Sequence, residues 1–359
     1  MADPRIARLR LIRTPAIGPI TWRQLVERFG SAEAAIEALP DLAGRGGGRA
    51  PQVAGVAQVE REIAATEKLG ARYLFLDDPD YPPLLAELDN APAALTLRGD
   101  IGLFARRTVA LVGARNASAA ACRFARGLAV ELGQQGVVIV SGLARGLDTA
   151  AHHGSLATGT IGVIASGIDI AFPPENRALQ EEVAQRGLLI AEQPPGSEPL
   201  ARNFPHRNRI IAGLSIGTVV VEAAPRSGSL ITARMAAEAG RDVMAVPGSP
   251  LDPRAQGCNQ LIREGATLVQ SSADILETIR PIDARMVRAP ALPFGGSPSA
   301  EPDIADRRAL VGLLGPVPVA IDELIRQSAL PPAIVATILL ELELAGRLER
   351  HAGARVSLR

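Results

Sequence analysis

Thr108-Val-Ala-Leu-Val-Gly-Ala-Arg-Asn-Ala-Ser118 is a short apolar run that ends in a glycine turn before a helical pattern. Val137-Val-Ile-Val-Ser-Gly-Leu-Ala-Arg-Gly-Leu-Asp148 repeats this arrangement. Further runs of the same kind lie at Thr160–Ala165, Leu188–Glu192, Thr218–Val221, Asp242–Ala245 and Thr267–Val269. Repeated strand-helix units predict an α/β fold with a doubly wound parallel sheet, covered by helices on both faces. Ligands of such sheets bind at the carboxyl ends of the strands.

The segment before this pattern, residues 1–75, is expected to be an N-terminal helical domain. Gly18-Pro19 separates its first two helical patterns, as in a helix-hairpin-helix or SAM-like fold, and a plain helical cap is the alternative. Thr21 and Ser31 stand where N-caps are expected, and Gly44–Gly48 is expected to be a flexible loop. Helical spacing occurs at Arg8–Arg13, Thr21–Phe29, Ala32–Ala38 and Ala57–Lys68.

Residues 76–280 contain the strand-helix units, and the proline-rich residues 281–303 are expected to form a linker. In residues 304–359, three helical patterns precede two short strand patterns, which predicts a winged helix. Its third helical pattern, Pro331–Ala345, contains two glutamates and no arginine. Because helices that read DNA present basic and amide side chains, contact with protein is favoured there over duplex reading.

Composition limits the function classes. The 359 residues include 38 basic and 38 acidic ones, so any affinity for nucleic acid must come from local charge. Lys68 is the only lysine and lies outside any Gly-Lys-Ser/Thr motif, which excludes a Walker-A phosphate loop. A Gly-x-Gly-x-x-Gly motif is also absent from the sequence. An ATP-driven motor and a dinucleotide-dependent dehydrogenase are therefore disfavoured.

Cysteine and apolar patterns suggest the compartment. Cys122 and Cys258 are far apart and form no Cys-x-x-Cys pair, which argues against a disulfide scaffold or a cysteine zinc site. The N-terminus lacks an apolar signal core, and no run has the roughly 18 apolar residues of a membrane helix. We expect a cytoplasmic protein with no membrane contact, no metal and no cofactor.

Four loops carry the candidate chemistry: Gly113–Ser118, Ser141–Asp148, Arg202–Arg209 and Pro225–Ala233. In the first, a glycine permits a tight turn, Arg115 suits phosphate oxygens, and the amides of the next helix start can hold an anion. The fourth opens another helix, with a similarly favourable N-terminus. Residues 105–235 hold 13 arginines against 9 acidic residues, whereas residues 236–280 hold 4 against 6. The half with these loops is thus locally basic.

In the third loop, arginines surround Phe204. A single strand of nucleic acid would place its phosphates on the arginines and a base on the ring. The alternative is an arginine-rich helix start whose phenylalanine belongs to the core. In the second loop, Asp148 is a candidate cap for the following helix.

Five motifs in this order resemble the DprA/Smf family of DNA-processing proteins: Gly113-Ala114-Arg115, Ser141-Gly142-x-Ala144-x-Gly146-x-Asp148, Arg207-Asn208-Arg209-Ile210-Ile211-Ala212, Ser227-Gly228-Ser229-Leu230-x-Thr232-Ala233, and Val246-Pro247-Gly248 with Gly257-x-Asn259-x-Leu261-Ile262. The resemblance covers about residues 79–279. It implies an extended Rossmann-like domain that binds single-stranded DNA without strong sequence preference. It also implies loading of the RecA recombinase during natural transformation, and a homodimer formed through the Rossmann-like domain.

By this resemblance, Arg115 holds a DNA phosphate. Ala114 replaces the family's usual serine, so a hydroxyl contact is lost while the backbone amide remains. Self-association and RecA contact are expected within residues 236–279. The single-strand-binding residues implied are Gly113, Ala114, Arg115, Ser141, Gly142, Gly146, Phe204, Arg207, Asn208, Arg209, Ser227, Gly228 and Ser229. No catalytic residue is expected.

Two other functions stay open. The first is a phosphoribohydrolase of the lysine-decarboxylase-like group, which carries the motif Pro-Gly-Gly-x-Gly-Thr-x-x-Glu. Residues 225–233 stand at that place and lack the glycine pair and the carboxylate of this motif. Glu222, just before them, could serve as a base. The adjacent His152 and His153 do not share a helix face, which disfavours a metal site. A transcriptional regulator would use the winged helix on duplex DNA.

Overall fold

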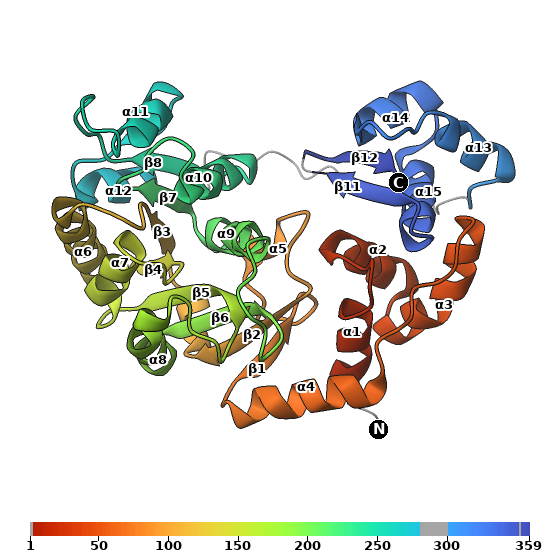
Figure 1. The fold of residues 1–359 in the computed structure, drawn as a ribbon, viewed down its shortest axis with the longest axis horizontal. Coiled ribbons are helices and arrows are strands. Elements are labelled where there is room, and N and C mark those ends of the chain that lie inside the picture. The colour runs from red at the N-terminus through yellow and green to blue at the C-terminus, as the bar shows by residue number, and fades with distance from the viewer. Residues whose placement is uncertain (1–2, 281–300, 352) are drawn as a thin grey trace. The chain divides into compact units, whose positions relative to one another are not determined.

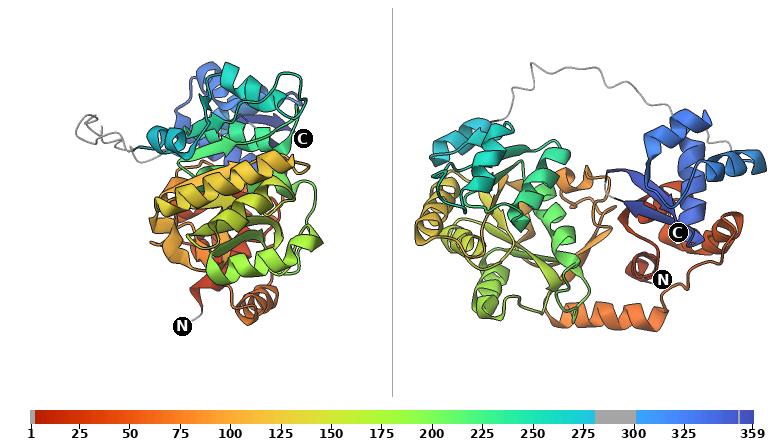
Figure 2. Two further views of the ribbon diagram at one scale, coloured as in Figure 1. Left: turned by 90° about the vertical axis from the view of Figure 1, so that its left-hand side faces the viewer. Right: turned by 45° about the horizontal axis from the view of Figure 1, so that its top comes forward.

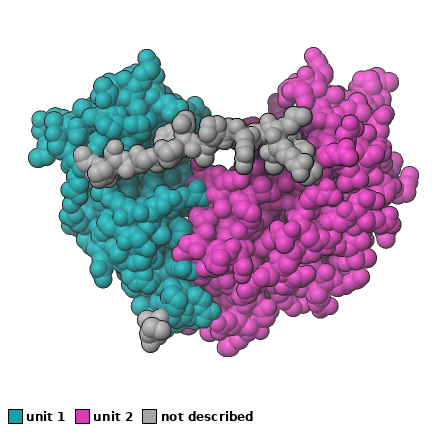
Figure 3. Space-filling view, turned by 180° about the vertical axis from the view of Figure 1, so that it is seen from behind, with its two compact units in different colours: residues 1–60, 287–359 teal, residues 61–286 magenta. Residues whose placement is uncertain are grey.

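The computed structural model describes residues 3–280, 301–351 and 353–359 (Figure 1). The chain forms two compact units, coloured separately in Figure 3: residues 61–286, and residues 1–60 together with 287–359. The N-terminal helices and the winged-helix segment thus share one unit. Most of the expected linker, residues 281–303, lies outside the described residues.

The larger unit is built on a nine-stranded sheet with the order β1-β2-β6-β5-β4-β3-β7-β8-β9. The seven strands from β6 to β9 in that order pair in parallel, so the predicted α/β class is confirmed. They are β3 (Thr108–Val112), β4 (Val138–Ser141), β5 (Thr160–Gly167), β6 (Leu188–Gln193), β7 (Gly217–Val220), β8 (Asp242–Ala245) and β9 (Thr267–Leu268).

Two antiparallel strands, which the sequence did not indicate, extend one edge of this sheet. β1 (Arg72–Phe75) pairs with β2 (Ala94–Gly99), and β2 pairs with β6. Neither belongs to a strand-helix repeat of the kind that identified the other seven, since β2 leads into the 3-10 helix η1 (Ile101–Ala105). The sheet therefore begins at Arg72, inside the segment 1–75 that was expected to be helical.

Helices cover both faces of this sheet (Figure 1 and Figure 2), and alternate residues of its central strands are buried against the two helical layers. On β3, Ala110 and Val112 pack on one side, and Val109 and Leu111 pack on the other. The first side carries α5 (Pro83–Ala86), α9 (Asn203–Leu214), α10 (Gly228–Glu238) and α11 (Gln256–Arg263). The second carries α6 (Ala119–Gln134), α7 (Leu147–Ser155), α8 (Arg177–Arg186) and α12 (Ser272–Thr278). The short 3-10 helix η2 (Pro174–Asn176) precedes α8.

The smaller unit begins with α1 (Pro4–Ile12), α2 (Pro19–Phe29) and α3 (Ala32–Arg45), and α4 (Val56–Lys68) spans the division between the units. Ser31 is the N-cap of α3, as predicted, because its hydroxyl accepts from the Ala34 amide at 3.2 Å. The expectation for Thr21 was wrong. Proline at the first helical position starts α2 at Pro19, three residues before the start that a Thr21 cap implies, so Gly18 is the cap and Thr21 is buried inside the helix.

The rest of this unit is a winged helix, as predicted. Its helices are α13 (Ile304–Gly312), α14 (Ile321–Ser328) and α15 (Pro332–Leu344). Its small sheet has the order β10-β12-β11, formed by β10 (Val319–Ala320), β11 (Leu348–His351) and β12 (Arg355–Leu358).

The glycine run after α3 packs against α15 instead of forming the expected free loop. A Cβ on Gly46 would lie 2.1 Å from the Glu341 carbonyl oxygen, and one on Gly48 would lie 2.4 Å from that of Ala345. The Arg347 guanidinium also donates to the Gly46 carbonyl at 3.1 Å. These glycines are therefore needed because the two backbones approach so closely.

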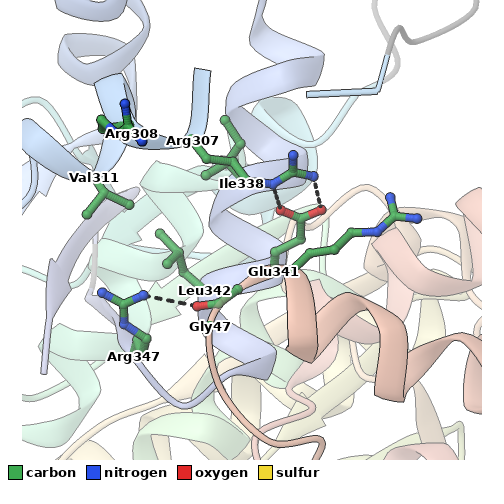
Figure 4. A pocket seen from close by; sticks show the side chains of 10 residues that line it. Gly47, Arg307, Arg308, Val311, Ile338, Glu341, Leu342 and Arg347 are labelled. Carbon is green, nitrogen blue, oxygen red and sulfur yellow. Dashed lines mark hydrogen bonds and ion pairs between the residues drawn. The ribbon is translucent and has the colours of Figure 1, made fainter. Parts of the chain in front are cut away.

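An ion pair between a half-buried arginine and a buried glutamate joins two helices of the winged helix (Figure 4). Arg307 of α13 donates two hydrogen bonds of 2.8 Å to the carboxylate of Glu341 on α15, which is 1% exposed. The hydrogen bonds to this carboxylate raise the pKa of Arg307. Both residues line a pocket of about 210 Å³ together with Arg45, Arg308 and Arg347. Glu341, one of the two glutamates counted in the third helical pattern, is thus an internal partner of Arg307.

Across the described residues, no single helix has the length and apolar character to span a membrane. One bent pair, α14 with α15, meets those criteria of length and composition only when its two helices are taken together.

Arg307→Ala is expected to lower the free energy of unfolding of the smaller unit by about 3 kcal/mol, since it leaves the buried Glu341 carboxylate without its partner. Trp22 is the only tryptophan of the chain and is 2% exposed in α2, so its fluorescence during urea denaturation reports on this unit. Arg326→Ala is the matched control, because Arg326 pairs with Glu323 on the surface with its side chain 74% exposed. Equal unfolding midpoints for the two variants would contradict the assigned role of the Arg307–Glu341 pair.

Candidate functional site

The four loops named from the sequence meet in one open pocket of about 490 Å³, beyond the carboxyl ends of β3 and β7. Nine of the thirteen candidate residues line it: Gly113, Ala114, Arg115, Phe204, Arg207, Asn208, Ser227, Gly228 and Ser229. The remaining four, Ser141, Gly142, Gly146 and Arg209, lie outside its lining.

These four have other contacts. Ser141 is fully buried, and its hydroxyl donates to the Leu111 carbonyl at 2.7 Å. Gly146 has a φ of +72°, and a Cβ there would lie 2.6 Å from the carbonyl oxygens of Ala114 and Arg115. The Arg209 side chain is 6% exposed and binds Glu192. Arg209 is therefore paired inside the fold and does not face the pocket.

Loop Gly113–Ser118 is tied to the end of β7 through Glu222. The Ala114 amide donates to the Glu222 carbonyl at 2.7 Å. The Ser118 amide and hydroxyl donate to the Glu222 carboxylate at 3.0 and 2.7 Å. The Ala114 amide, which was expected to stay available for a phosphate, is thus already bonded. Glu222 anchors the start of α6, so its carboxylate is engaged and the base expected of a hydrolase loses its support.

Arg207 lies at the floor of the pocket in the first turns of α9. It is 6% exposed, and its Nη1 donates to the Val163 carbonyl at 3.3 Å. A Cβ on Gly142 would lie 1.3 Å from that nitrogen, so this glycine is what gives the guanidinium its place. Burial lowers the pKa of Arg207 to about 10, and nearby Asp148 opposes this shift. The Nε atom has no hydrogen-bond partner within the described part of the chain.

Asp148 is not the helix cap that the sequence suggested. Gly146 occupies the N-cap position of α7 without a side-chain bond. The Asp148 carboxylate instead accepts from the amides of Gly142 and Ala144 at 3.2 and 3.3 Å, which holds the second loop in shape. Burial raises the pKa of Asp148, while Arg207 and these amides favour its charged form.

At the pocket rim, the Arg115 guanidinium lies over the Phe204 ring, and the Phe172 ring meets the Phe204 ring edge-on. The Arg115 guanidinium carbon lies 5.1 Å from the centre of the Phe204 ring, and Arg115 is exposed. The Phe172 ring centre lies 5.7 Å from that of Phe204, at an interplanar angle of 60°. Phe204 is half-buried, so it is neither wholly core nor freely exposed. Sequence reasoning missed Phe172, because a lone phenylalanine before two prolines carries no recognisable signal.

The fourth loop opens α10 as predicted. Ser227 is the N-cap, and its hydroxyl oxygen lies 2.8 Å from that of Ser229. The Asn208 side-chain amide donates to the Gly228 carbonyl at 3.4 Å, which links α9 to this helix start. The pocket wall thus combines a helix N-terminus with hydroxyl and amide groups, which suits an anionic ligand.

No group of three or more His, Cys, Asp or Glu side chains that could hold a metal occurs among residues 3–280, 301–351 and 353–359.

The part of the chain that carries the pocket matches a known protein family. Residues 72–280 match the family model described as DNA recombination-mediator protein A. The chain belongs to this family. Members of the DNA recombination-mediator protein A family are DNA-binding proteins that mediate recombination. Residues 2–65 match a DprA-like N-terminal helix-hairpin-helix domain, and residues 296–354 match a DprA winged helix domain. The resemblance read from the five motifs is therefore confirmed.

Known family members resemble the chain over much of its length. Protein Smf of Synechocystis is 34% identical over 386 residues, covering 96% of each chain. The X-ray structure of DNA processing protein A from Streptococcus pneumoniae has a TM-score of 0.65 at 33% identity and covers 77% of this chain and 98% of its own. A structure of the Helicobacter pylori protein, described for its unique single-stranded DNA binding mode, has a TM-score of 0.53 at 29% identity. It covers 58% of this chain and 95% of its own.

His152 lies in α7, outside the pocket lining. It is fully buried, its Nδ1 is 2.7 Å from the Thr160 hydroxyl, and its Nε2 has no partner in the described residues. Burial, with smaller contributions from His153 and Arg207, lowers the pKa of His152 from 6.5 to about 3. The ring is therefore neutral at pH 7.

His152→Asn is expected to weaken the acid sensitivity of folding. The unfolded chain binds a proton near pH 6.5 that the folded chain excludes until about pH 3. The native protein therefore loses about 1.4 kcal/mol of stability per pH unit below about pH 6 from this group alone. Urea denaturation between pH 7 and 5, followed by circular dichroism, measures the difference. His153→Asn, at the exposed neighbour, is the control, and parallel curves for native protein and His152→Asn would contradict the assignment.

Proposed function

We propose that the pocket between the four loops binds single-stranded DNA without strong sequence preference. One observation carries the proposal: an exposed arginine, a buried arginine and a helix N-terminus surround one pocket whose rim holds an aromatic ring. Phosphates and ring faces are common to all single strands, so such a site does not depend on sequence. The relative described for its single-stranded DNA binding mode supports the same ligand.

Each pocket group has a distinct task in this proposal. Arg115 reaches into solvent and meets a phosphate first. Arg207 cannot move, because its guanidinium is enclosed by the fold, so it provides a fixed positive charge beneath the phosphate. Ser227 and Ser229 add hydroxyl groups at the start of α10. A desolvated cation attracts a phosphate more strongly than one in water, because the local dielectric constant is lower.

Family membership supports a wider role for the chain. We propose that the chain acts in the cytoplasm as a non-catalytic mediator that loads RecA onto single strands, as a homodimer formed through residues 76–280. The test is the rate at which RecA assembles on strands coated with a single-strand-binding protein, with the mass of the mediator measured by light scattering. An unchanged assembly rate would overturn the RecA role, and a monomer at working concentration would overturn the dimer.

Each of the two rival functions predicts a result that single-strand binding does not. Release of free base from nucleoside monophosphates would favour the hydrolase, which the engaged Glu222 carboxylate disfavours. Tighter binding to duplex than to single strands would favour the winged-helix regulator. Fluorescence anisotropy with single and duplex oligonucleotides of equal length, over a salt series, tests the main proposal directly.

Arg115→Ala is expected to weaken single-strand binding similarly for all sequences. It should also reduce the steepness of log K against log salt by about 1, because the variant makes one phosphate contact fewer and so releases fewer counterions when it binds. Anisotropy titrations at several salt concentrations measure both effects. Arg186→Ala, at an exposed arginine outside the pocket, is the control and should keep the native slope. A native slope in Arg115→Ala would place the phosphate contact elsewhere.

A further inference from the structure

Phe172 is an aromatic ring left open to solvent beside the pocket. Its exposed fraction is 43%, and it is the only aromatic among the exposed large apolar residues in the described part of the chain. Phe172 is not part of the pocket lining, but its ring contacts the ring of Phe204, which lines the pocket. The apolar rim therefore extends one ring beyond the pocket.

The segment that carries Phe172 is tied down on both sides. Before it, the Ser166 hydroxyl donates to the Ile170 carbonyl at 2.7 Å. After it, the Asn176 side-chain amide donates to the Leu143 carbonyl at 2.9 Å and the Ala144 carbonyl at 3.3 Å. The ring is thus presented from a segment bonded to the second pocket loop. An aromatic side chain fixed in this way loses little conformational entropy when a flat ligand stacks on it.

The two rings are not equally available. Phe204 already contacts Arg115 over its ring and Phe172 beside it. A base that stacked on Phe204 would compete with the arginine expected to hold a phosphate. Phe172 has a single ring contact among the described residues and keeps an open surface.

We propose that Phe172 is a stacking subsite for one nucleobase of a single strand whose neighbouring phosphate lies on Arg115. The inference rests on the proposed single-strand binding and adds to it a residue and a ligand group. Phe204 then acts as the support between them, because it contacts both side chains. Stacking on an open ring tolerates all four bases, since every base has a π-face.

The test pairs a ring substitution with a missing base. Oligonucleotides that each carry one abasic site, moved one position at a time, are titrated by anisotropy against the native full-length chain, Phe172→Leu and Phe172→Trp. For the native chain, one abasic position should weaken binding about tenfold, as expected for a lost base–aromatic stack. Phe172→Leu keeps an apolar side chain against Phe204 but has no ring, so that position should no longer matter. Phe172→Trp should restore the dependence.

The controls separate this inference from the function on which it rests. Val130→Ala changes an exposed apolar residue of α6 outside the pocket and should keep the native abasic profile. If the native chain binds no single strand, the proposed function itself fails. If binding persists and Phe172→Leu keeps the native profile, only the Phe172 subsite is overturned. A loss of affinity at every abasic position alike in Phe172→Leu would indicate a structural role for the ring and would overturn the subsite too.

Discussion

Close packing of backbone against an arginine at the pocket floor is the constraint on which the site depends. The Arg207 guanidinium occupies the space where any residue other than glycine at position 142 would place its Cβ. Gly146 and Gly113 meet similar limits, against the Ala114 carbonyl and the Leu147 side chain. Gly142 and Gly146 therefore shape the floor and walls of the pocket without lining it. This explains why Gly142 and Gly146 lie outside the pocket lining although the pocket needs them.

A buried cation at that floor needs compensation, and the protein supplies only part of it. The Asp148 carboxylate is nearby, but its hydrogen bonds go to loop amides, and the hydrogen bond recorded for Arg207 goes to a carbonyl. Burying a charge without a full set of partners is unfavourable. A phosphate above the guanidinium would supply the missing negative charge. Arg209 differs in its charge balance, because its guanidinium forms an ion pair with Glu192, although its Nη1 atom has no hydrogen-bond partner among the described residues.

Strand-helix repeats and their glycine turns are local patterns, so the sequence predicted the seven parallel strands and the convergence of the four loops at one edge of the sheet. It failed where tertiary contacts decide. β1 and β2 lack a following helix of the repeat, and nothing local shows that Arg209 turns to Glu192 while Arg207 turns to the pocket. The sequence also does not show that the Ala114 amide is bonded to the carbonyl of Glu222, which follows β7. The position of Phe172 beside the Phe204 ring is likewise visible only in the folded structure.

In the winged helix, too, a tertiary contact changes an argument that was based on the sequence alone. Its third helix was judged a poor DNA reader because it carries glutamates, but Glu341 is consumed by Arg307 inside the unit. What argues against duplex reading is packing instead of charge. The glycine run after α3 lies so close to α15 that a Cβ on Gly46 would overlap the Glu341 carbonyl. A duplex reaching that face of α15 would first have to displace α3, and with it the buried contacts that hold the unit together. The single-strand binding proposed for the larger unit has no such requirement, because its pocket is already open.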